Sequence, residues 1–161
     1  MEFLDVVDNN DNVVGRTAYE EVYAKKLGHR IVHVLIFNDK GEMALQLRSM
    51  KKLFCPGHWS TAVGGHVQAG ENYEQAALRE FEEELGRKTE IKFENKFLYE
   101  TKEGMKKHLG IFSTVFNGPF EVNLEEVDKV EYFKLDKIKE MINQGEKFHP
   151  ELLFLLKKSY F

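Results

Sequence analysis

The stretch Gly65–Gly86, GHVQAGENYEQAALREFEEELG, decides how this chain folds. It carries three glutamates, Glu80, Glu83 and Glu84, at positions i, i+3 and i+4. On an α-helix, with roughly 100° per residue, these side chains share one face within a sector of about 100°. Carboxylates that close repel one another. Such a face therefore calls for a cation, either a neighbouring Lys or Arg or a bound metal ion.

The residues around the carboxylates predict the helix that carries them. Asn72 is an N-cap residue, and Gln75 three positions later completes a capping box. Gly86 ends the helix, as glycines commonly do. An apolar stripe next to the carboxylate face consists of Ala77, Leu78, Phe81 and Leu85.

This segment resembles the signature of the Nudix hydrolases, which reads glycine, five residues, glutamate, seven residues, Arg-Glu, a bulky apolar residue, any residue, Glu-Glu, any residue, glycine. The departure is Arg87, where the family usually has an aliphatic residue packed behind the helix end. The resemblance spans residues 65–87 and is highly specific. The matching positions are Gly65, Glu71, Arg79, Glu80, Phe81, Glu83, Glu84 and Gly86.

Composition places the chain among soluble globular proteins and excludes several classes of partner. Its 161 residues fit one domain, residues 1–161, and 42% are apolar while 31% are charged. A net charge of −4 provides no basic field for nucleic acid, and no apolar run approaches the ~18 residues of a membrane span. The acidic N-terminus does not read as a signal peptide. Cys55 is the single cysteine, which indicates a reducing, cytoplasmic setting. The oligomeric state stays open.

Periodicity and turn residues predict alternating strands and helices. Residues 30–37 and 42–48 read as a hairpin around the turn 38–41. Thr17 with Glu20 reads as a capping box, and Asp136 reads as the cap of a helix that runs to Gln144. We expect an α/β fold with three α/β/α layers around a mixed sheet, and the Nudix resemblance implies the same sandwich. Strands are expected over 2–7, 13–17, 30–37, 42–48, 61–63, 90–99, 107–116 and 129–135, and helices over 17–26, 72–86, 136–144 and 150–159.

Clustered carboxylates are hard oxygen ligands that suit Mg²⁺, or Mn²⁺, rather than zinc. Such an ion neutralises phosphate oxygens and positions water, so a small-molecule diphosphate is the fitting substrate. The resemblance implies hydrolysis of a nucleoside diphosphate linked to another group. It also implies that Glu80, Glu83, Glu84 and the Gly65 carbonyl hold the metal. Arg79 would hold a glutamate in place, and Glu71 would fix the loop geometry.

The general base varies within the family, and Glu80, Glu125 and Glu126 all stay open here. Arg48, Lys51 and Lys52 form a basic cluster that can bind the diphosphate or can simply be a solvated loop. Substrate choice is expected to depend on the loops 49–60, 102–106 and 117–126. Trp59 can stack on a base, although at strand spacing it fits a core better.

A longer resemblance, over roughly the first hundred residues, is to isopentenyl-diphosphate isomerase, which shares the Nudix sandwich. That enzyme uses a cysteine just before a Gly-His step, where this chain has Gly64. It also uses glutamates on a later strand, where this chain reads Lys106-Lys107-His108-Leu109, so the acid and base of isomerisation are missing. The matching positions are His29-Arg30, Phe37-Asn38, Gly41, Gln46, Arg48, Lys51-Lys52, Pro56-Gly57, Trp59 and Gly65-His66.

We therefore expect a hydrolase in the isomerase-like branch of the family. The alternatives are an isomerase-like enzyme and a non-catalytic nucleotide-binding Nudix domain, which would usually have lost helix glutamates. His29 and His66 match histidines that hold metal in the isomerases, but without the paired glutamates they fit core residues better. Cys55, His58 and His66 match no standard zinc spacing.

Overall fold

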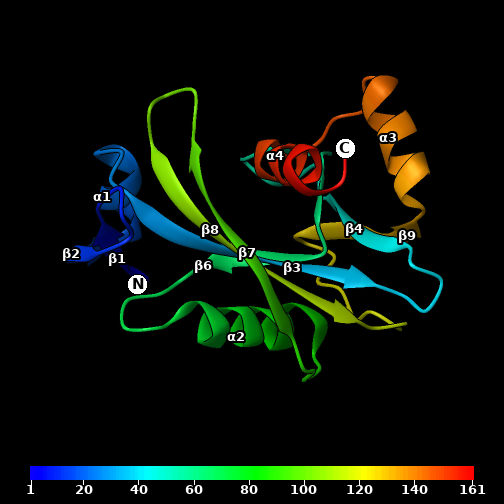
Figure 1. Ribbon diagram of the computed structural model, residues 1–161, viewed down its shortest axis with the longest axis horizontal. Coiled ribbons are helices and arrows are strands. Elements are labelled where there is room, and N and C mark those ends of the chain that lie inside the picture. The colour runs from blue at the N-terminus through cyan, green and yellow to red at the C-terminus, as the bar shows by residue number, and fades with distance from the viewer.

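The computed structural model describes all residues, 1–161, and arranges them in three layers (Figure 1). Helix α2 (Tyr73–Leu85) covers one face of a large sheet, while α3 (Leu135–Asn143) and α4 (Pro150–Ser159) lie on the other side. A small antiparallel pair, β1 (Phe3–Val7) and β2 (Val13–Ala18), packs with α1 (Tyr19–Ala24) at one end. The expected α/β/α sandwich is confirmed. No helix combines the length and apolar composition needed to cross a membrane.

The large sheet has seven strands and is mixed. Strands β3 and β8 run parallel from His29↔Lys107 to Phe37↔Val115, and every other pairing is antiparallel. Its members are β3 (His29–Phe37), β4 (Met43–Arg48), β5 (Trp59–Thr61), β6 (Val63–His66), β7 (Lys92–Glu100), β8 (Lys106–Val115) and β9 (Val127–Phe133).

The sheet consists of two strand groups that meet at one point. Strand β3 lies between β6 and β8, β4 lies between β5 and β9, and β3 pairs with β4 only at Phe37↔Met43. The predicted hairpin of residues 30–37 and 42–48 is therefore right at its turn and wrong along its length. Both strands are apolar on two faces, so each finds its ladder partners in distant segments. Away from this junction the two strand groups diverge, which leaves room between them.

Alternation along β3 divides the core into two clusters, one under each helical layer. Val32, Val34 and Ile36 pack with α2, whereas Ile31 and Leu35 pack toward α4. Trp59 belongs to the α4 side, where it is 8% exposed and meets Phe133 edge-to-face at 5.2 Å. The core interpretation of Trp59 is therefore correct.

Helix α2 begins and ends as its sequence predicts. The Gln75 amide N–H donates to Asn72 Oδ1 (2.8 Å), and the Asn72 N–H donates to Gln75 Oε1 (2.9 Å). Gly86 adopts the left-handed conformation, with φ +68°. The predicted apolar stripe is wrong at Leu78, which is 37% exposed, whereas Ala76, outside the predicted stripe, is buried. The residues that α2 buries are Ala76, Ala77, Phe81 and Leu85.

Arg87, the departure from the family signature, is exposed rather than packed in the core. Its guanidinium lies over the ring of Phe116 at 5.8 Å from the ring centre. A cation–π contact therefore replaces the aliphatic contact expected behind the helix end.

Two other predicted caps are wrong. Ala18 is the N-cap of α1, and the Thr17 hydroxyl bonds to Glu21 instead of capping the helix. Lys134 is the N-cap of α3, so Asp136 lies inside its first turn. In both cases the strand before the helix continues to the cap and fixes the backbone there. Pro150 does begin α4, as predicted, after the N-cap residue His149.

We expect Asn72→Ala to lower the free energy of unfolding by about 1 kcal/mol, because the capping box loses its side-chain acceptor. Urea denaturation should show a lower midpoint with an unchanged slope. Asn143→Ala, at the exposed end of α3, is the matched control and should stay within about 0.5 kcal/mol of the wild type. Equal losses in the two variants would contradict this role of Asn72.

Candidate active site

A cavity of about 970 Å³ opens between the two strand groups. One wall comes from α2 and β6, another from β4 and the loop 117–126, and a third from β3, β8 and the start of α4. Its size suits a nucleotide-sized molecule. The four residues that the signature predicts as metal ligands all line the cavity: Gly65, Glu80, Glu83 and Glu84.

Glu80 lies directly against the glycine turn. A Cβ at Gly65 would stand 2.3 Å from Glu80 Oε1, so only glycine lets the strand approach this carboxylate. The side chain of Glu80 is 13% exposed. Burial raises the pKa of this carboxyl, and the bond from Arg79 opposes that rise only in part.

Arg79 ties the glutamates to the loop before the helix. Its Nε and Nη2 donate to the two oxygens of Glu71 at 2.8 Å each, and Nη2 also donates to the His66 carbonyl at 3.0 Å. Its Nη1 donates to Glu80 Oε1 (2.9 Å) and Glu83 Oε2 (3.3 Å). Bonds to Glu71, ahead of the opposing effect of burial, raise the pKa of Arg79, so it is a permanent cation.

Glu71 faces away from the cavity chemistry and stabilises the loop. Besides its two bonds from Arg79, it accepts the backbone N–H of Gln68 at 2.8 Å. These charge-assisted contacts lock residues 66–71 onto the helix that follows.

Glu84 is the least compensated charge in the cavity. It is partly buried, and its one hydrogen bond comes from the backbone N–H of Gly64 at 3.2 Å. Burial raises the pKa of its carboxyl well above the usual value, and the negative charge of Glu80 adds to the rise. A buried carboxylate among other carboxylates is costly unless a cation joins it.

The donor set fits a hard divalent cation, although its side chains are not yet gathered around one point. No group of three or more His, Cys, Asp or Glu side chains stands in a metal-holding arrangement. The reason is visible in the contacts, because Arg79 engages both Glu80 and Glu83. Glu83 is 59% exposed and free to turn, and Glu84 already lacks a counter-charge. The residues therefore fit such an ion once Glu83 turns from Arg79.

The members of the predicted basic cluster lie close together. Arg48, Lys51 and Lys52 all line a smaller pocket of about 520 Å³, and Arg48 and Lys52 also line the main cavity, which Lys51 does not. The backbone N–H of Lys51 donates to Ser49 Oγ at 3.1 Å. Arg48 is anchored by donating Nε to the Phe54 carbonyl at 3.0 Å.

Some of the candidate bases and loops line the cavity, and others do not. Glu126 lines the cavity and lies 3.9 Å from Lys52 Nζ, but Glu125 does not line it. The loops 49–60 and 117–126 both contribute side chains to the lining. The loop 102–106 contributes none, so its predicted part in substrate choice has no contact to support it.

The two histidines matched to the isomerases are held by protein groups. His66 Nδ1 lies 2.7 Å from Glu2 Oε1, and Nε2 lies 2.8 Å from the Tyr23 hydroxyl. His29 is fully buried with Nδ1 at 2.9 Å from the Leu27 carbonyl, and its Nε2 has no partner. Burial lowers the pKa of His29 to about 4, so it is neutral at pH 7.

Sequence reasoning missed a set of charged and polar side chains on the wall of the cavity below α4. The available signal was a polar residue inside an apolar run, as at His33 in β3 or Glu151 before the run Leu152–Leu156. Neither residue belongs to the signature, and only the fold brings them together. The cavity-lining residues of this set are His33, Lys107, His149 and Glu151.

A cavity with a glutamate-bearing helix under a mixed sheet is the arrangement of a phosphate-directed hydrolase, and comparisons with known proteins agree. The sequence profile of the family described as NUDIX domain matches residues 27–156. This chain belongs to the Nudix family of hydrolases, whose members act on pyrophosphate bonds of nucleoside diphosphate derivatives and generally use divalent metal ions.

Relatives in sequence carry the same family name. An uncharacterized Nudix hydrolase of Yersinia pestis is 35% identical over 130 residues, covering 81% of this chain and 71% of the relative. An uncharacterized Nudix hydrolase of Streptomyces coelicolor is 39% identical, covering 78% and 71%. An isopentenyl-diphosphate delta-isomerase of Photorhabdus laumondii is 31% identical, covering 89% and 84%, which fits the branch expected from the sequence.

A solved structure supports the fold. The crystal structure of DR0079 from Deinococcus radiodurans superposes with a TM-score of 0.87 at 24% identity, covering 99% of this chain and 100% of that one. The likeness therefore extends to the small β1–β2 pair and the C-terminal helix, and it concerns the fold alone.

In metal-free buffer at pH 7, we expect Glu84→Gln to raise the free energy of unfolding by about 1 kcal/mol, because a buried uncompensated charge disappears. The folded-state pKa of Glu84 lies above the unfolded value of 4.5, so the folded protein binds its proton more tightly. Wild-type stability should therefore rise as pH falls from 7 toward 4.5, and this slope should shrink in the variant. Thermal unfolding in EDTA measures both.

Glu82→Gln, on the same helix but outside the cavity, is the matched control and should behave like the wild type. A destabilised Glu84→Gln variant would show instead that the ionised carboxylate stabilises the fold.

Proposed function

We propose that this protein, with residues 1–161 as one Nudix domain, is a Mg²⁺-dependent hydrolase of the diphosphate linkage in a nucleoside diphosphate derivative. Glu80, Glu83 and Glu84, with the Gly65 carbonyl, would hold the ion. The observation that carries the proposal is the buried Glu84 carboxylate, which faces other carboxylates and lacks a counter-cation. Mn²⁺ has the same preference for oxygen ligands and could replace Mg²⁺.

When bound, the ion would neutralise the charge of the diphosphate oxygens and lower the pKa of water. The chain's own residues supply the rest. Arg79 stabilises the glutamate face by bonding Glu71, Glu80 and Glu83 at once. Arg48 and Lys52, which line the opposite wall, would bind phosphate oxygens, and the planar Arg48 guanidinium suits two of them. The anionic substrate would thus lie between a cationic wall and the glutamates.

A general base must reach the attacking water and be ionised when it acts. Glu126 lines the cavity opposite α2, and its charge is felt by Glu84. Glu80 also lines the cavity, but it would be occupied as a metal ligand. Glu126 is therefore our preferred base, Glu80 is the alternative, and Glu125 is outside the cavity.

Isomerase chemistry finds no support in the geometry, despite the isomerase-named relative. At the position of the isomerase cysteine, Gly64 offers only a backbone N–H, which donates to Glu84. Cys55 does not line the cavity, and burial raises the pKa of its thiol. A non-catalytic nucleotide-binding role would not explain why the complete set of helix glutamates is present.

We expect purified protein with Mg²⁺ to release a monophosphate from nucleoside diphosphate derivatives. Glu83→Gln and Glu84→Gln should each lower kcat/KM at least about 100-fold, because each removes an anionic metal ligand worth several kcal/mol in the transition state. The exposed neighbour Glu82→Gln is the matched control and should retain wild-type activity. Phosphate release measured over a panel of nucleoside diphosphates, sugar nucleotides and dinucleotides is the assay.

Full activity in both variants, or full activity in EDTA, would overturn the metal-dependent mechanism. Tight nucleotide binding without turnover at any Mg²⁺ concentration would favour the non-catalytic domain.

The neighbouring pair Glu125 and Glu126 allows a separate test of the base. Glu126→Gln should lower kcat about 100-fold or more with little change in KM, whereas Glu125→Gln should change neither, because only Glu126 faces the cavity. Steady-state kinetics at pH 7 and pH 9 measure both variants. Normal kcat in Glu126→Gln would point to Glu80 as the base.

A further inference from the structure

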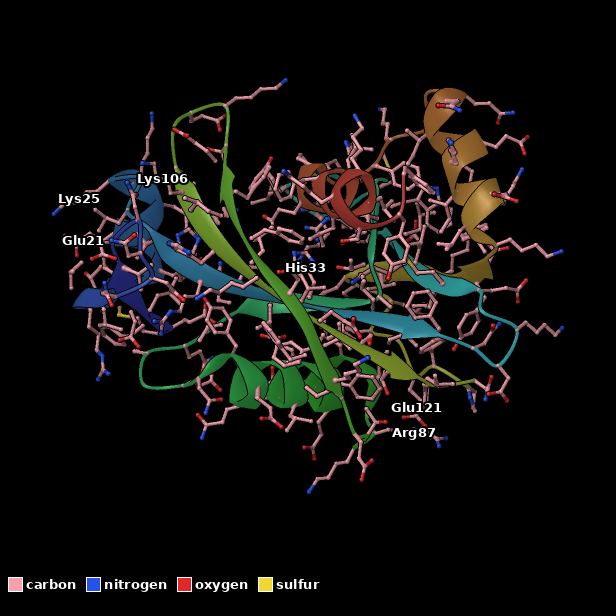
Figure 2. The ribbon with its side chains drawn as sticks, viewed as in Figure 1. Glu21, Lys25, His33, Arg87, Lys106 and Glu121 are labelled. Carbon is pink, nitrogen blue, oxygen red and sulfur yellow. The ribbon has the colours of Figure 1, made fainter.

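Below α4 the cavity holds charged groups that cleavage of a phosphoric anhydride does not require. Lys107 extends from β8, His33 from β3 and Glu151 from the first turn of α4, and all three line the cavity. Figure 2 shows His33 between the sheet and α4, on the side of the sheet opposite α2. The same cavity thus joins the glutamate face to a second polar wall.

These groups form a connected network. Glu151 Oε2 lies 3.0 Å from Lys107 Nζ, and Glu151 Oε1 lies 2.9 Å from His33 Nε2. His33 Nδ1 lies 2.7 Å from the hydroxyl of Thr61, which also lines the cavity. The side chains of His33, Lys107 and Glu151 are each at most 7% exposed.

Both charges of the Lys107–Glu151 pair persist at neutral pH. Burial raises the pKa of Glu151, but the hydrogen bond from His33 and the charge of Lys107 more than offset it and hold that pKa below its usual range. Burial likewise lowers the pKa of Lys107, and the charge of Glu151 more than offsets it. The wall therefore presents a cation and an anion side by side.

The pair keeps hydrogen-bonding capacity that the protein does not use. The ammonium of Lys107 has three donors, of which Glu151 takes one and the Tyr23 side chain a second, so one donor is spare. The carboxylate of Glu151 has about four acceptor sites, and two are filled by side chains. His149 adds a donor, because its Nδ1 accepts the Glu151 N–H (3.1 Å) and burial lowers its pKa to about 4, which leaves the proton on Nε2.

A buried ion pair is a poor way to stabilise a fold. Apolar side chains of the same size often stabilise as much or more, since removing two charges from water is costly. Apolar residues are available on this side of the sheet, since Leu152, Leu155 and Ile31 all belong to the buried apolar cluster there. A hydrocarbon group bound in this part of the cavity would displace water from the spare donors and acceptors without replacing the hydrogen bonds that the water made.

We propose that Lys107 and Glu151 form a recognition subsite for a hydroxyl-bearing group of the substrate, such as the sugar of a sugar nucleotide, and that this subsite rejects hydrocarbon groups. A hydroxyl oxygen can accept a hydrogen bond from Lys107 Nζ while its own O–H donates to a carboxylate oxygen of Glu151, which satisfies both partners at once. The inference rests on the proposed function and deepens it, since it specifies the group attached to the diphosphate.

The test compares two ligands that differ only in hydroxyls, a uridine diphosphate hexose and the cyclohexyl ester of uridine diphosphate. The double variant Lys107→Met/Glu151→Gln removes both charges, because Lys107→Met alone would leave a buried carboxylate unpaired. Lys106→Met is the matched control, since Lys106 bonds to Asn9 outside the cavity (Figure 2). Thermal unfolding checks that each variant is folded.

We expect the wild type and Lys106→Met to prefer the hexose ligand at least 10-fold in kcat/KM. The double variant should lose about 10- to 100-fold on the hexose ligand alone, as is typical when a charged hydrogen-bond partner is removed. Calorimetric titration of both ligands onto metal-free wild type and Glu151→Gln measures the same preference as affinity, without turnover and without the double substitution.

The two failures are distinguishable. Binding selectivity without any hydrolysis would overturn the proposed function and keep the subsite. Hydrolysis of both ligands with equal kcat/KM and equal affinity in the wild type would overturn the subsite and keep the proposed function, as would equal losses on both ligands in a folded double variant.

Discussion

The structure depends on bringing three acidic side chains of one helix face, with one arginine, against a glycine turn. The Glu80 carboxylate lies so close to Gly65 that a Cβ at position 65 would displace it. Arg79 then holds the face together through Glu71, Glu80 and Glu83, while Glu84 stays without a counter-charge. The apolar face of α2 is therefore packed in the core, whereas the negative charge on its acidic face is not fully balanced. Proteins tolerate such an unbalanced charge mainly where a bound ligand supplies the opposite charge.

The signature helix could be predicted from sequence almost to the residue, because its information is local. The capping box at Asn72, the left-handed Gly86 and the carboxylate spacing all act within one or two turns. Caps that compete with a preceding strand could not be predicted, and both Thr17 and Asp136 were assigned wrongly for that reason. The pairing of β3 with β8 rather than β4 is likewise a choice between partners far apart in sequence, which no local pattern encodes.

In the candidate site, too, some residues could be predicted from the sequence and others could not. The acidic wall could be predicted because it lies on one helix, whereas the polar wall below α4 combines residues 33, 107 and 151, which are far apart in the chain. Each looks ordinary by itself: a histidine in a strand, a lysine at a strand start and a glutamate at a helix start. The basic cluster needed the structure too, since only Arg48 and Lys52 of its three members line the main cavity.

The single junction of the two strand groups, at Phe37 and Met43, has a consequence for how this fold can diversify. The acidic wall is carried by α2 and β6, while β4, β9 and their loops carry the opposite side. Substitutions on β4 or at positions 117–125 can therefore change which ligand enters while the acidic wall on α2 and β6 stays in place. A scaffold divided in this way lets selection alter ligand preference and reaction chemistry as nearly independent traits.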